Sequence, residues 1–256
     1  MYPVLPFGPI TIPTGPLVVL IALTVGLEVA GRYGRRLQLS SDDVWNTGLL
    51  WVLVSVIVAR LWNVIQFWDV YITEPWLILS LRPSGFVWGG GLPVGIVAAY
   101  FYWWRRALSP LLMSVALAGG AIATAALVEV GAFLTGSVIG LPSTWLWALP
   151  YYGVMRHPVA LYYAIGLTLL VGGGWFFIRR MTPGRLLLCW LLGVGLLFLW
   201  LGAYEEGNQT VLSLRANQLL GLLLALVACA GLASRPAKEE TLMLPDRTVT
   251  EQEPSG

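Results

Sequence analysis

Long apolar stretches dominate the chain, and the polar residues gather in the short segments between them. Seven stretches are long enough to cross a hydrocarbon core of about 30 Å as helices of about 20 residues. A helix satisfies its backbone hydrogen bonds internally, as lipid requires, so we expect each stretch to be helical. The predicted spans are residues 15–31, 44–68, 86–104, 108–136, 158–178, 186–204 and 216–234.

Arginines are divided unequally between the connections that join these spans. The connections after the first, third and fifth spans hold Arg32, Arg35, Arg36, Arg105, Arg106, Arg179, Arg180 and Arg185. The even-numbered connections hold only Arg82, Arg156 and Arg215. Arginine-rich connections are cytoplasmic by the positive-inside rule. We therefore predict an all-α membrane protein, a bundle of seven transmembrane helices with its N-terminus outside and its C-terminus cytoplasmic.

Composition agrees with a membrane bundle and limits the partners. Hydrophobic residues make up 57% of the chain and charged residues 11%, against roughly 25% charged residues in soluble domains. The net charge of +2 comes from arginines that flank the spans, so we expect no nucleic-acid partner. Residues 1–234 should form one domain. Residues 235–256 mix charge with Pro, Ser and Thr without periodicity, which predicts a disordered cytoplasmic tail.

Two ionisable residues fall deep inside predicted spans. Arg60 lies near the middle of the second span and Glu129 inside the fourth. A charge at the centre of a membrane helix costs about 2.5–3.5 kcal/mol, so each should face a partner or a wet cavity. We predict that the two pair with each other. Such a pair could either bind substrate or only fix the packing of the helices.

The third span opens with three consecutive glycines followed by Pro93, in the stretch VWGGGLPVG. Gly90 and Gly91 expose backbone, so another helix or a lipid headgroup could approach closely. Tight packing of helices through small residues is common in membranes. The sequence leaves a ligand site and a helix contact as alternatives.

The stretch VMRHPVALYY holds the only histidine in the chain. Pro158 suits the first turn of the fifth span, which places Arg156 and His157 at the start of that helix. An arginine is mildly unfavourable at this positive end of the helix dipole unless an anion is close. Tyr162 and Tyr163 follow within two turns. The stretch is therefore either a site for a lipid phosphate or an aromatic anchor at the membrane interface.

The run RHPVALYYA resembles the Arg-His-Pro-x-x-Leu-Tyr-Glu element of bacterial prolipoprotein diacylglyceryl transferases, and the resemblance covers roughly residues 13–233. Further matches to that family are Gly15-Pro16, Arg60, Glu74-Pro75, Gly90-Gly91-Leu92 and Asn217-Gln218. Seven spans with an external N-terminus are also typical of the family.

Departures from the family occur where polar groups are expected. The stretch VEVGAFLTGSVIG, residues 128–140, is similar to the family signature in its glycines and in Phe133. Glu129 stands where the family has an arginine, and Ser137 stands where it has a glutamate. A carboxylate in place of a guanidinium reverses the charge that would meet a phosphate. Arg60, Arg156 or Arg215 would have to supply that charge instead.

The resemblance implies a multi-pass protein of the bacterial plasma (inner) membrane. Its implied reaction transfers diacylglyceryl from phosphatidylglycerol to a lipobox cysteine thiol in lipoprotein biosynthesis, and glycerol-1-phosphate leaves. We expect His157 and Arg156 to be catalytic. The expected substrate-binding residues are Arg60, Tyr162, Tyr163, Glu129, Gly90, Gly91, Gln218 and Arg215.

The partners follow from the same resemblance. They are phosphatidylglycerol or another anionic phospholipid, a prolipoprotein substrate, and the membrane itself. We expect no cofactor and no metal, since Cys189 and Cys229 lie in the middle of spans and suit packing. The alternative function is that of a catalytically inactive relative, which binds a phospholipid or a partner membrane protein.

Overall fold

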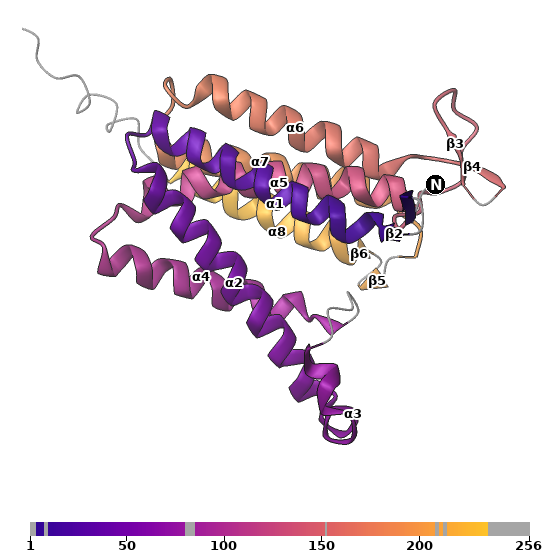
Figure 1. Ribbon diagram of the computed structural model, residues 1–256. Helices are drawn as coiled ribbons and strands as arrows, with labels where there is room; N and C mark the ends of the chain where they lie inside the picture. Colours follow the sequence, from indigo (N-terminus) through magenta and orange to yellow (C-terminus); the bar gives the residue numbers. More distant parts are fainter. Residues whose placement is uncertain are drawn as a thin grey trace, which may run out of the picture.

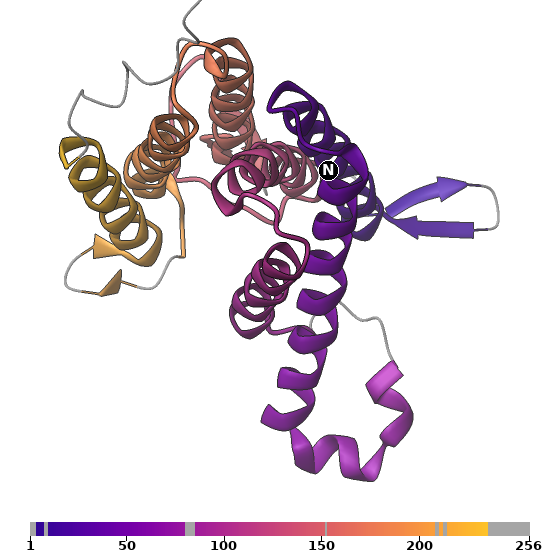
Figure 2. The ribbon, with the colours of Figure 1, turned by 90° about the vertical axis from the view of Figure 1, so that its left-hand side faces the viewer.

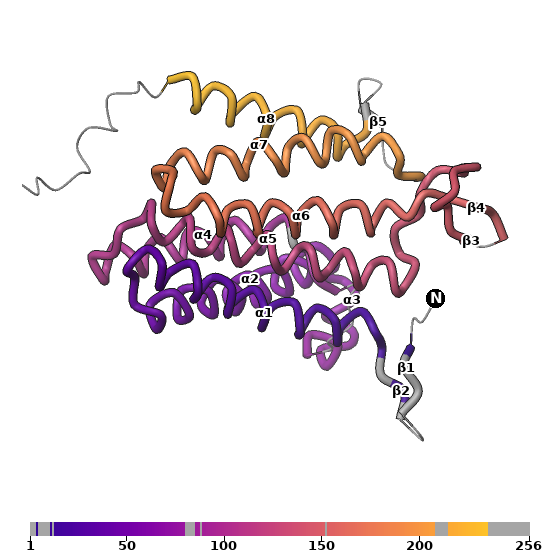
Figure 3. Tube along the Cα trace, turned by 90° about the horizontal axis from the view of Figure 1, so that it is seen from above, coloured from indigo at the N-terminus to yellow at the C-terminus, as the bar shows by residue number. Residues whose placement is uncertain are grey.

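Helices that run back and forth along one direction form most of the molecule (Figures 1 and 3). The computed structural model describes residues 4–7, 10–79, 85–151, 153–207, 210–211 and 214–234. The long helices are α1 (Thr14–Arg36), α2 (Ser41–Gln66), α4 (Trp88–Arg105), α5 (Pro110–Thr135), α6 (Val159–Phe177), α7 (Pro183–Leu201) and α8 (Ala216–Ala233). The predicted tail, residues 235–256, and Arg82 lie outside the described residues.

Six helices in the described part of the chain are long and apolar enough to cross a membrane. They are α1, α2, α5, α6, α7 and α8, with α7 counted through Tyr204. The chain is therefore an all-α, multi-pass membrane protein. The remaining predicted span, the third at residues 86–104, corresponds to α4, which has 18 residues but is not among the six. Its glycines, its proline and its many Trp and Tyr residues lower its average hydrophobicity.

Several helices begin and end at residues whose chemistry fixes the boundary. Pro110 and Pro183 occupy the first turns of α5 and α7, where a missing N–H costs nothing. The N–H of Asp43 donates to the side chain of Ser40 and so caps α2. Gly136 ends α5 with φ of +70°, a left-handed conformation that glycine adopts without strain. These boundaries lie within a few residues of the predicted ones.

Helix α5 lies at the centre of the bundle and packs against α1 and α6, while α2 pairs with α4 and α7 pairs with α8. Glycines allow α1 and α5 to approach closely. A Cβ atom added to Gly120 would lie 2.5 Å from the carbonyl oxygen of Gly26 and 2.7 Å from Cβ of Ala30. Since real Cβ contacts are longer than this, the contact requires small residues.

Three short antiparallel hairpins connect or precede the helices. They are β1 (Val4–Phe7) with β2 (Ile10–Pro13), β3 (Leu149–Tyr151) with β4 (Val154–Arg156), and β5 (Thr210–Val211) with β6 (Leu214–Arg215). All three lie at one end of the bundle, which we call the hairpin end (Figures 1 and 3). Helices α1, α6 and α8 therefore begin at the same end of the bundle (Figure 3).

An arm departs from the bundle after α2. It consists of α3 (Trp68–Thr73) and the 3-10 helix η1 (Pro75–Leu79), and it projects away from the other helices (Figures 1 and 2). Its large apolar side chains are mostly exposed, and they include Trp68 and Trp76. Tryptophan favours the interface between lipid and water.

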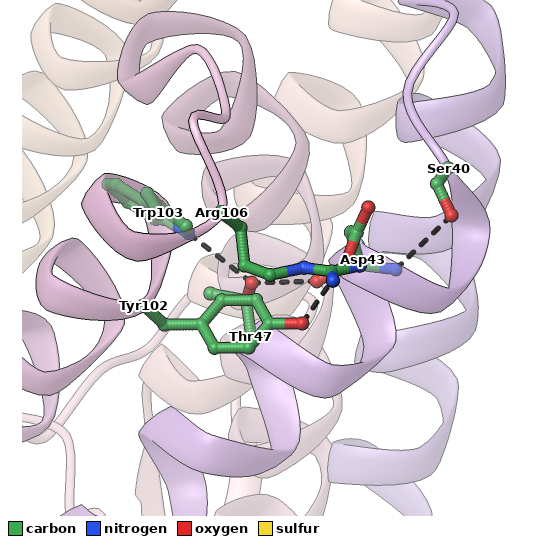
Figure 4. A network of polar contacts seen from close by, with 6 residues as sticks. All are labelled: Ser40, Asp43, Thr47, Tyr102, Trp103 and Arg106. Atoms are coloured by element: carbon green, nitrogen blue, oxygen red, sulfur yellow. Dashed lines mark hydrogen bonds and ion pairs between the residues drawn. The ribbon is translucent and has the colours of Figure 1, made fainter.

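A polar network ties α2 to α4 at the end opposite the hairpins (Figure 4). The carboxylate of Asp43 accepts hydrogen bonds from the hydroxyl of Tyr102, at 3.2 Å, and from the guanidinium of Arg106, at 3.1 Å. The hydroxyl of Thr47 accepts a 3.3 Å bond from Trp103 Nε1. The neighbouring Asp43 carboxylate raises the pKa of Arg106, so this arginine is held as a cation.

Candidate functional site

Three chain segments meet through backbone hydrogen bonds at the hairpin end. Leu141 N–H donates to the carbonyl of Tyr204 at 2.8 Å, and Glu206 N–H donates to the carbonyl of Ile139 at 2.8 Å. His157 N–H donates to the carbonyl of Leu141 at 3.1 Å. Segments 139–142, 154–157 and 204–206 are thereby fixed side by side, and we call them the platform. The platform places Arg156 and His157 next to residues about fifty positions later in the chain.

Arg156 is held on the platform but keeps an unused donor. Its Nη1 donates to the carbonyl of Gly140 at 3.0 Å and forms an ion pair with the carboxylate of Glu206. Its Nε atom is buried and has no hydrogen-bond partner. A buried donor without an acceptor costs about 1–3 kcal/mol, more on a charged group. An anionic oxygen at this position would remove that cost.

His157 lines an open hollow on the surface of the platform. The hollow has a volume of about 480 Å³ and is lined by Pro142, Ser143, Thr144, Trp145, Val154, Met155 and His157. The Nδ1 atom of His157 lies 3.2 Å from the hydroxyl of Tyr162. Its ring packs at 5.1 Å from that of Tyr204 and at 6.3 Å from that of Trp145, between ring centroids. The imidazole is thus oriented from three sides.

Two carboxylates lie near each other at the platform. Glu129 comes from α5, and Glu205 directly follows the 3-10 helix η3 (Gly202–Tyr204). The side chain of Glu205 accepts a 2.8 Å hydrogen bond from Asn217 of α8. One carboxylate oxygen of Glu129 is buried without a hydrogen-bond partner. The two carboxylates are close enough to interact electrostatically.

Two tyrosine hydroxyls without partners accompany these carboxylates. Tyr163 is 3% exposed, and its hydroxyl lies near the carboxylates of Glu205 and Glu129 but meets no acceptor at hydrogen-bonding geometry. Tyr151 is equally buried, with its ring 6.4 Å from that of Phe133. Burial raises the pKa of the Tyr151 phenol, so it stays a protonated donor. The hairpin end therefore holds several buried polar atoms that lack partners.

Arg60 does not pair with Glu129, and this prediction from the sequence is wrong. The guanidinium donates to three backbone carbonyls, those of Ile78 at 3.0 Å, Gly85 at 2.7 Å and Leu77. The rings of Tyr71 and Phe86 flank it at 5.4 and 5.5 Å. The carbonyls are the partner that a charge at this depth requires. Arg60 therefore fixes the arm to α2.

Arg215 and Gln218 also bind backbone. Arg215 donates from Nη1 to the carbonyls of Gly202 at 3.0 Å, Ala203 at 2.8 Å and Glu205. Its N–H donates to Gln218 Oε1 at 3.1 Å, at the start of α8. These bonds hold the 202–205 segment against α8. Both residues support the site from outside the hollow, and their place as substrate-binding residues stays a prediction.

Gly90 and Gly91 lie in the contact between α2 and α4. A Cβ atom on Gly91 would be 2.8 Å from Cβ of Ala59, and one on Gly90 would be 3.0 Å from the indole of Trp62. This geometry favours helix packing over lipid binding at these glycines. Within the described part of the chain, no group of three or more His, Cys, Asp and Glu side chains could hold a metal ion.

Sequence reasoning missed Tyr204 and Glu206, which contact His157 and Arg156. The signal that could have found them is the run Tyr204-Glu205-Glu206, which ends an apolar span. Two adjacent glutamates are unusual beside a membrane span, and this run lies at the same predicted side as Arg156. The sequence alone does not show that segments 154–157 and 204–206 lie side by side, because backbone hydrogen bonds across the platform determine this arrangement.

The comparisons with known proteins agree on one family. Residues 3–234 match prolipoprotein diacylglyceryl transferase. A phosphatidylglycerol–prolipoprotein diacylglyceryl transferase of Clostridioides difficile is 29% identical over 143 residues, which cover 56% of this chain and 58% of that protein. The proteins of the same name from Finegoldia magna and Parasynechococcus marenigrum are 23% and 30% identical. These matches cover 80% and 76% of this chain, and 84% and 76% of the relatives. The chain belongs to the prolipoprotein diacylglyceryl transferase family.

Proposed function

We propose that the chain transfers a diacylglyceryl group from phosphatidylglycerol to a cysteine thiol of a prolipoprotein. The observation that carries the proposal is the unused, buried Nε donor of Arg156, whose neighbour in the chain, His157, lines an open hollow. The relatives described above bear names that state this donor lipid and this acceptor. A phosphate group suits a guanidinium with a free donor, because charge-assisted hydrogen bonds are the strong ones.

The chemistry assigns a step to each residue. The thiol sulfur attacks the carbon of the diacylglycerol unit that carries the phosphate ester. A C–S bond forms as the C–O bond to the phosphate breaks, and glycerol-1-phosphate leaves with the bonding electrons. His157 accepts the thiol proton at Nε2, provided that its Nδ1–H donates to Tyr162. Arg156 stabilises the phosphate as negative charge develops on the leaving oxygen. The proton can then pass from His157 to the departing phosphate.

The same proposal includes a topology of seven spans. Helix α4 lies alongside α2 and would be the seventh span, with its aromatic side chains at the membrane interface. The arginine-rich connections then face the cytoplasm, and the N-terminus and the hairpin end face the outside of the bacterial inner membrane. Residues 1–234 would form the transferase domain, and residues 235–256 the cytoplasmic tail. The site would open toward the outer leaflet.

A second candidate is a relative that binds phosphatidylglycerol without transferring it. The observation that favours it is the engagement of the other arginines. Arg60 and Arg215 are bound to backbone carbonyls, which leaves Arg156 as the cation available to a phosphate among these three. The carboxylates of Glu129 and Glu205 lie close by. They would oppose the negative charge that develops on the leaving phosphate oxygen during transfer.

Complementation separates the two candidates. The chain is expressed in a bacterial strain depleted of its own transferase, and lipidation of a lipobox substrate is measured by a mobility shift and mass spectrometry. We expect lipidation by the parent chain and by the control Arg180→Gln, which changes an arginine at the opposite end. His157→Gln should retain phosphatidylglycerol binding in nanodiscs and lose transfer. Binding by the parent without lipidation would favour the inactive relative, and neither activity would contradict both.

A further inference from the structure

The ion pair between Arg156 and Glu206 is asymmetric in its burial. The side chain of Arg156 is 16% exposed, whereas that of Glu206 is 45% exposed. Ion pairs with a solvent-exposed partner contribute little to stability. The side chain of Glu206 can therefore rotate toward the solvent at a small cost in free energy, whereas the guanidinium of Arg156 is held in place. An arriving phosphate would exchange one anion for another on Arg156.

The backbone of Glu206 keeps its carboxylate near the site after such an exchange. Its N–H is bound to the carbonyl of Ile139 at 2.8 Å, and the carbonyl of Tyr204 accepts from Leu141 at 2.8 Å. The turn after it includes Gly207, which has φ of +83°. Only the side chain of Glu206 is free to rotate. A headgroup beyond the phosphate would thus lie within a side-chain length of this carboxylate.

We infer that Glu206 is a specificity-determining residue for the lipid headgroup. Its carboxylate pairs with Arg156 while no lipid is bound. When the phosphate binds Arg156, this ion pair breaks, and the carboxylate then faces the substituent beyond the phosphate. Hydroxyl groups on that substituent donate hydrogen bonds to the carboxylate, whereas a second negative charge is repelled. The inference rests on the proposed function only in placing the lipid phosphate at Arg156. The preferred class is a phosphodiester lipid with an uncharged, hydroxylated headgroup.

Two lipids with the same glycerol headgroup test the inference. Phosphatidylglycerol carries one phosphate, and phosphatidylglycerol phosphate carries a second one on the same headgroup. Their binding to the full chain in nanodiscs is compared for the parent and for Glu206→Gln. We expect the parent to prefer phosphatidylglycerol by about tenfold or more. Glu206→Gln should bind phosphatidylglycerol a few times more tightly, because no carboxylate competes with the lipid phosphate for Arg156. It should also lose most of the preference for phosphatidylglycerol, because no negative charge repels the second phosphate.

Three further variants keep the outcomes distinct. Asp69→Asn removes another exposed carboxylate, on α3, and should leave the preference unchanged. Glu206→Asp keeps the charge and should restore part of the preference, which a merely structural role would not predict. Arg156→Gln should weaken the binding of both lipids. Unchanged binding in Arg156→Gln would overturn the phosphate site and hence the proposed function.

The inference about Glu206 has its own refutation. If Arg156→Gln weakens binding but Glu206→Gln discriminates between the two lipids as the parent does, Glu206 does not select the headgroup. If Glu206→Gln binds phosphatidylglycerol more weakly than the parent, the carboxylate is not a competitor for the guanidinium. Either result overturns the inference while leaving the phosphate site in place.

Discussion

Replacement of Arg60 by methionine is expected to release the arm from helix α2. The guanidinium makes three hydrogen bonds to the carbonyls of Leu77, Ile78 and Gly85. Bonds that involve a charged group contribute about 1.5–3 kcal/mol each. The lower value applies here, because carbonyls freed in a partly exposed arm can bind water. Three bonds at about 1.5 kcal/mol give a local loss of about 4.5 kcal/mol.

Hydrogen exchange measured by mass spectrometry reports this loss directly. A local opening made easier by about 4.5 kcal/mol speeds exchange roughly a thousandfold where opening limits it. The increase should be confined to amides of residues 68–79. Amides in the contact between α1 and α5 should be unaffected. Arg180→Met provides the control, since that guanidinium lies over the ring of Phe176 at 4.4 Å in another part of the bundle.

Two results would refute the reasoning about Arg60. The first is unchanged exchange of residues 68–79 in Arg60→Met. The second is recovery of stability when Glu129→Leu is added, because recovery is the sign of a buried ion pair. The structure places no such pair, so the two substitutions should add within about 0.5 kcal/mol, as independent sites do.

Three other substitutions test packing and buried polar groups. Tyr163→Phe removes a buried hydroxyl without a partner and should stabilise the protein by about 1 kcal/mol in detergent unfolding, while lowering transfer if the hydroxyl faces substrate. Asp43→Asn weakens the bond to Arg106 and should lower the unfolding temperature by about 2–4 °C; no change would contradict the network. Gly26→Ala should destabilise the α1–α5 contact by about 1–3 kcal/mol, whereas Gly172→Ala, in open space, should not.

The helices were predictable because the length and apolar composition of each segment are enough to indicate a membrane span. The predicted span 108–136 corresponds to α5 at Pro110–Thr135, and the predicted span 44–68 to α2 at Ser41–Gln66. Length and apolarity decide such segments without reference to the rest of the chain. The hairpins had no such signal. Strands of two to four residues are too short for an alternating pattern, and only their tertiary partners define them.

The candidate site was predictable in part, for a related reason. Arg156 and His157 were singled out because their chemistry is rare in so apolar a chain. The structure places both on the platform, and their catalytic role stays a prediction. The predicted pairing of Arg60 with Glu129 was wrong. The position of a charge within a membrane span indicates that it needs a partner, but it does not identify that partner. Backbone carbonyls have no sequence signature. Glu206 was missed because fifty residues separate it from Arg156, and only the folded platform brings them together.

Satisfaction of hydrogen bonds separates the structural polar groups from the candidate functional ones. Arg60 donates from three nitrogens to three backbone carbonyls, and Arg215 donates from Nη1 to three others. These bonds satisfy the two guanidinium groups within the protein. Within the described residues, five buried side-chain atoms have no partner, and four of them belong to Glu129, Tyr151, Arg156 and Tyr163. All four lie at the hairpin end. Since each such atom costs stability, their concentration at the hairpin end supports the proposal that a bound molecule supplies the missing partners.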